Sequence, residues 1–113
     1  MRSVRRLDYH MRYQFVLQFL GDSVADYDVL VLLEERLIAV LGDTAEVDGH
    51  DIGSGETNDF VLTDDPRSSM GRVAPILDEY AGPRTMRVAF RQVAGGGYTV
   101  LWPQGFRGRF SVA

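Results

Sequence analysis

Polar residues that could carry out chemistry gather between residues 43 and 65. This segment holds eight of the 16 acidic residues and neither lysine nor arginine. Two of its carboxylates, Asp48 and Glu56, flank a turn with two glycines, and His50 lies just before that turn. A carboxylate beside an imidazole can act as a general acid–base pair. Asp48, His50 and Glu56 are therefore the candidate catalytic residues of a small hydrolase-type enzyme.

The same segment offers oxygen ligands for a divalent cation. Asp48, Asp51 and Glu56 could bind Ca²⁺ or Mg²⁺, because both ions prefer oxygen ligands such as carboxylates. Their spacing differs from that of an EF-hand, whose loop carries regularly spaced acids, a glycine and a final glutamate. A phosphate loop is excluded, since no lysine follows the glycines and the surrounding charge is negative. A solvated hairpin, a partner-binding surface and a metal or catalytic site remain as interpretations.

Composition excludes several other kinds of site. The chain has no cysteine, which removes disulfides, thiolate metal sites and cysteine nucleophiles. All 12 basic residues are arginine, so no lysine can form a Schiff base. The net charge of −4 argues against nucleic acid as the main partner. We expect no cofactor.

Charge is distributed unevenly along the chain. Residues 1–12 have a net charge of +3, residues 13–66 of −12, and residues 67–113 of +5. Opposite charges at separate places can steer a protein partner or a second copy of the same chain. We therefore expect a non-enzymatic interaction or regulatory module with an acidic hairpin surface. The residues expected to bind the partner are Asp48, Asp51, Glu56, Asp59, Arg87 and Arg91.

Hydrophobic periodicity predicts five strands and two helices. The expected strands cover residues 11–20, 44–50, 58–63, 85–93 and 98–102. The first helix should begin at Ser23 or Asp26 and end at Leu41. Its apolar residues cover so much of its circumference that we expect the helix to be buried or covered by a partner. The second should begin at Asp65 and end at Gly82, with either a kink at Pro75 or a regular helix that starts only there.

This order of elements resembles the ferredoxin-like fold, an α+β two-layer sandwich with a mostly antiparallel sheet and two helices on one face. The resemblance covers residues 11–93, and the last strand extends the sheet. The residue pattern predicts one domain over residues 11–103, a flexible extension at 1–10 and a tail at 104–113 that is loose or packs on the sheet. The ferredoxin-like strand order also places the acidic second strand at one edge of the sheet and the arginine-bearing strand toward the other.

The segment from Val47 to Asn58, VDGHDIGSGETN, is similar to a stretch found in small bacterial proteins without an assigned activity. The resemblance implies a single compact domain. No run approaches the roughly 18 apolar residues of a membrane span, so we expect a cytoplasmic protein. The expected core consists of Phe15, Leu17, Phe19, Leu30, Leu33, Leu37, Phe60, Leu62, Val73, Leu77, Val88 and Phe90.

Overall fold

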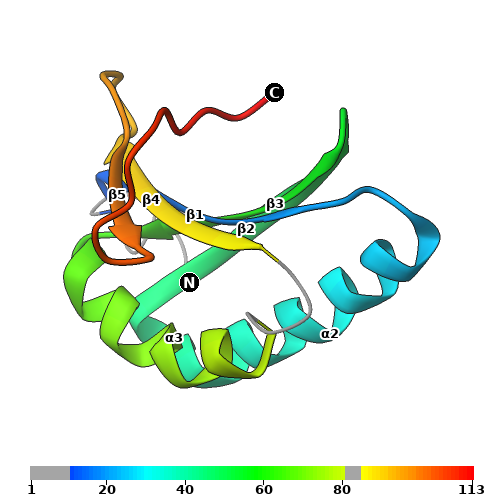
Figure 1. Ribbon diagram of the computed structural model, residues 1–113. Coiled ribbons are helices and arrows are strands. Elements are labelled where there is room, and N and C mark those ends of the chain that lie inside the picture. Colours follow the sequence, from blue (N-terminus) through cyan, green and yellow to red (C-terminus); the bar gives the residue numbers. More distant parts are fainter. Residues whose placement is uncertain (1–10, 81–84) are drawn as a thin grey trace.

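The computed structural model describes residues 11–80 and 85–113, which form one sheet with two helices on one of its faces (Figure 1). The strand order is β2-β3-β1-β4-β5, and all neighbours are antiparallel. The predicted α+β sandwich is therefore confirmed. The expected extension at residues 1–10 and the end of the second helix lie outside the described residues. The elements are β1 (Tyr13–Leu20), α2 (Val24–Leu41), the 3₁₀ helix η1 (Gly42–Thr44), β2 (Ala45–Gly53), β3 (Glu56–Thr63), α3 (Pro66–Tyr80), β4 (Met86–Gln92) and β5 (Thr99–Trp102).

Local signals in the sequence set the helix starts. The Ser23 side chain accepts a hydrogen bond from the Asp26 amide at 3.1 Å, and the Asp26 carboxylate accepts one from the Ser23 amide at 2.9 Å. This reciprocal cap satisfies two amides that a helix start leaves free, so α2 begins directly after Ser23. Asp65 caps α3 in a similar way, by accepting from the Ser68 amide at 3.1 Å. The helix is continuous from Pro66 to Tyr80 and includes Pro75, so it does not start only at Pro75.

The main core lies between the sheet and the two helices. Nine of the twelve expected core residues are buried, and the exceptions are Phe60, Leu62 and Phe90. The phase predicted for β3 was wrong, because Val61 lies opposite Phe15 and therefore faces the helices with it. Phe60 consequently points to the other face of the sheet.

The C-terminal tail packs on the face of the sheet that the helices leave open. Figure 1 shows the tail running on the side of the sheet opposite α2 and α3. Phe110 is buried there against Val16 and Ala89, and its ring meets the edge of Tyr98. The side-chain amide of Gln18 donates to the Ser111 carbonyl at 3.0 Å. The tail therefore completes a second, smaller apolar cluster.

Replacing Phe110 by alanine should lower the free energy of unfolding by about 3 kcal/mol, because it empties the centre of this cluster. Urea denaturation measures the change. Val93→Ala is the matched control, since that side chain is 54% exposed and its loss should cost little. Equal and small effects of the two substitutions would show that the tail contributes nothing to stability.

Candidate functional site

A β-bulge decides which way His50 points. The sequence alternation predicts that Glu46, Asp48 and His50 share one face of the second strand. The pairing of β2 with β3 shifts between Val47 and Gly49, so Asp48 is an extra, unpaired residue. A bulge residue reverses the alternation of the residues that follow it. His50 therefore lies opposite Asp59 and faces α2.

The structure separates the residues expected to act as a catalytic or metal site. His50 faces α2, whereas Glu56 lies on the opposite face of the sheet, where it accepts hydrogen bonds from Asn58 and from the amide of Ala113 at 2.8 and 2.9 Å. Asp48 and Asp51 are exposed on β2. Within residues 11–80 and 85–113, no three histidine or acidic side chains are arranged to hold a metal ion. The expected acid–base and metal sets are therefore not formed.

His50 instead joins a different cluster under α2. Its Nδ1 lies 3.0 Å from a carboxylate oxygen of Glu34. The ring of Tyr27, about two helical turns before Glu34, meets the His50 ring edge-on, with 6.1 Å between the ring centres. Asp59 lies beside His50 on the neighbouring strand and faces Glu34. The cluster therefore unites one helix and two strands.

Asp59 is the most unusual member of this cluster. Only 1% of the residue is exposed, and neither carboxylate oxygen has a hydrogen-bond donor among the described residues. Burial, and then the nearby carboxylate of Glu34, raises the pKa of Asp59 to about 9. The group is therefore protonated at neutral pH, and its one proton can be shared with Glu34. Asp59 was expected to bind a partner, and in the free protein its side chain is closed to solvent.

Glu34 was missed by reasoning from the sequence. Helical spacing places it with Glu35 and Arg36 on the solvent side of α2, yet its side chain is only 20% exposed. The cause is the position of α2 against β2 and β3, which brings His50 and Asp59 over this part of the helix. The available signal was Asp59, a charged residue among the apolar residues of β3. It did not identify Glu34 on α2 as its neighbour.

The outward side of α2 carries a row of exposed apolar side chains, which we call the α2 stripe. Spacings of three, four and seven residues place four of them on one side of the helix, and Leu32 widens the row. Carboxylates at Asp28, Glu34 and Glu35 flank it. The exposed fractions are 81% for Val24, 44% for Tyr27, 37% for Val31, 57% for Leu32 and 60% for Ile38.

The arginines expected at the binding surface lie on β4, three strands away from β2. The guanidinium of Arg87 stacks 5.0 Å from the Phe106 ring, and that of Arg91 stacks 5.2 Å from the Tyr98 ring. Arg91 also donates to the Gln14 side chain at 3.1 Å. Both guanidinium groups are thus held by aromatic rings of their own chain. They lie on a strand that β3 and β1 separate from the acidic β2.

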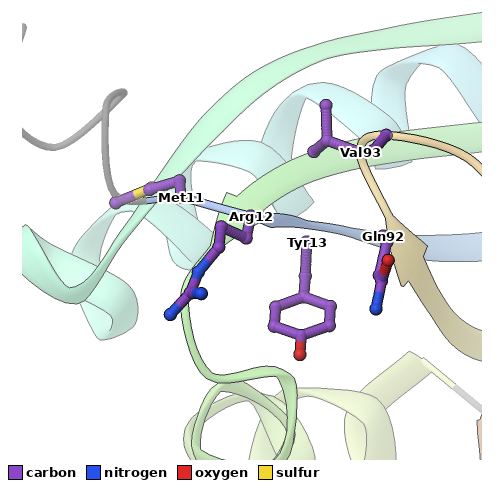
Figure 2. A pocket seen from close by; sticks show the side chains of 6 residues that line it. Met11, Arg12, Tyr13, Gln92 and Val93 are labelled. Atoms are coloured by element: carbon purple, nitrogen blue, oxygen red, sulfur yellow. The ribbon is translucent and has the colours of Figure 1, made fainter.

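A pocket of about 450 Å³ lies at the start of β1 and the end of β4. Figure 2 shows that its labelled side chains point in different directions, with Val93 opposite to Tyr13 and Gln92. Arg12 pairs with the exposed Asp64, and the described residues that line the pocket include neither a carboxylate nor an imidazole. These described residues therefore provide no acid–base pair.

No protein-family model, no curated protein and no solved structure matches this chain. The described helices include none with the length and apolar character that crossing a bilayer demands.

Proposed function

We propose that this protein is a non-enzymatic interaction module that binds an apolar and basic segment of a protein partner along α2. The observation that supports it best is the α2 stripe, where five large apolar side chains are exposed on one helix. A helix that is apolar nearly all round is normally covered on every side. Its inner side packs on the sheet through Leu30, Leu33 and Leu37, and its outer side is free for a partner.

Charge defines the chemistry of that partner. The stripe is flanked by Asp28, Glu34 and Glu35, and the adjacent edge strand β2 exposes Asp48 and Asp51. Burying the apolar side chains supplies the affinity, at roughly 25 cal/mol per Å² before the cost of association. The carboxylates steer a basic segment and repel an acidic one.

A second copy of this chain fits the stripe less well. A symmetric antiparallel pairing of two α2 helices about Val31 would place Val24 against Ile38, which is favourable. The same pairing would place Asp28 of one copy opposite Glu34 of the other, and like charges at close range are unfavourable. We therefore favour a basic partner over a homodimer.

The test uses a fluorescent 18-residue amphipathic peptide, the length of α2, with a leucine stripe and lysines elsewhere. Fluorescence anisotropy should give a Kd on the order of 10 μM. The variant Val24→Gln/Ile38→Gln should weaken binding at least about tenfold, because it removes two apolar contacts. A peptide with glutamates in place of the lysines should not bind.

Val93→Gln is the matched control, since Val93 is an exposed apolar residue outside α2, directly after the end of β4. Equal affinity of the protein and the Val24→Gln/Ile38→Gln variant for the lysine peptide would contradict the proposal. Sedimentation at low and high salt tests the other occupant: a dimer that the same double substitution abolishes would assign the stripe to a second copy.

A further inference from the structure

We propose that Glu34 and Asp59 form an anchoring site for a single arginine side chain of the partner, at the boundary between α2 and β3. This inference rests on the proposed function, because it assigns the polar contact within the same binding surface. The anchoring site binds one cationic head group through two carboxyl groups, whereas the α2 stripe provides apolar contacts.

The first argument is the state of Asp59. Its carboxyl group is 1% exposed and has no donor among the described residues. A buried carboxyl group without a donor is destabilising, so its environment is incomplete in the free protein. The groups that face it are Glu34 and, beyond it, Tyr27 from α2, His50 from β2 and the apolar Leu17 from β1. Glu34 can accept the proton of Asp59, but it brings a further negative charge and offers no donor to the Asp59 oxygens.

The second argument is the position of Glu34 within the surface. It lies three residues after Val31 and four before Ile38, so a segment bound along the stripe passes beside it. Its side chain is 20% exposed, whereas Asp59 behind it is closed to solvent. The pair therefore leads from the surface into the body of the protein.

Arginine suits this pair better than lysine. Its guanidinium is planar and offers five N–H groups, which can bind two carboxylates at once, and it keeps its charge when partly buried. Asp59 holds a proton in the free protein at neutral pH. Binding of the cation would favour the ionised carboxylate, and the proton would pass to the buffer, so that the site ends with two carboxylates and one guanidinium.

The test compares three peptides that share the leucine stripe, have glutamine at the other positions, and carry arginine, lysine or glutamine at one central position. The arginine peptide should bind at least about tenfold more tightly than the glutamine peptide. Glu34→Gln should abolish this difference. Glu35→Gln is the matched control, because it removes the same charge from the next residue of the same helix.

Calorimetry in two buffers with different ionisation enthalpies adds a readout that a general electrostatic effect would not move. At pH 7 the arginine peptide should release about one proton on binding, and none when Asp59 is replaced by asparagine. Equal losses in Glu34→Gln and Glu35→Gln, or no proton release, would overturn the anchoring site. If the lysine and arginine peptides both bind more tightly than the glutamine peptide by the same factor, the preference for a guanidinium is overturned. Binding of the glutamine peptide along the stripe in the same experiments would leave the proposed function standing.

Discussion

Replacing Asp59 by asparagine should raise the free energy of unfolding by about 2–4 kcal/mol at pH 7. The folded protein must keep this carboxyl group protonated, because burial and Glu34 raise its pKa from 3.8 to about 9. The unfolded chain releases the same proton at any pH well above 3.8. Asparagine has a similar shape and carries no charge, so it avoids this cost. Its buried amide keeps the gain below the full linkage value.

The pH dependence of this effect has a definite sign. Between about pH 4 and pH 9 the folded state binds one more proton at Asp59 than the unfolded state, so stability falls as pH rises, by about 1.4 kcal/mol per unit. Above the folded pKa the loss is complete. The advantage of Asp59→Asn should therefore grow from pH 5 to pH 9 and vanish near pH 4.

Urea denaturation at each pH measures both curves. Asp51→Asn is the control, because Asp51 is an exposed carboxylate on the neighbouring strand, and its replacement should leave the slope unchanged. Parallel stability curves for the protein and Asp59→Asn would mean that Asp59 is ionised in the folded state.

Replacing Leu37 by alanine should lower the free energy of unfolding by about 2–5 kcal/mol. Leu37 is fully buried in the main core, between α2 and the sheet, so its loss leaves a cavity. Ile38→Ala is the neighbouring control, since that side chain is 60% exposed and alanine favours helix. The control should change stability by less than about 1 kcal/mol. A cost below about 0.5 kcal/mol for Leu37→Ala would mean that the inner and outer sides of α2 are reversed.

The architecture was predictable because its signals are local. The cap at Ser23 and Asp26, the Asp65–Pro66 helix start and the alternation in β1 each act within a few residues. The separation of acidic β2 from the arginines of β4 followed from the expected strand order, and it is observed.

The candidate site was not predictable, because one unpaired residue changes it. Without the bulge at Asp48, the alternation would turn His50 away from α2, as the sequence suggests. Glu34 and Asp59 are 25 residues apart in sequence and meet only when α2 packs on β2 and β3. The burial of Asp59 depends on that packing, so no pattern around it could identify its role.

The bulge at Asp48 also affects how crowded copies of this protein behave. A regular strand at the edge of a sheet presents a continuous row of backbone groups, on which strands from other molecules can add to form aggregates. In β2 the row is broken between Val47 and Gly49, and Asp48 and Asp51 place negative charges along it. These two features protect the edge from intermolecular sheet growth at high concentration.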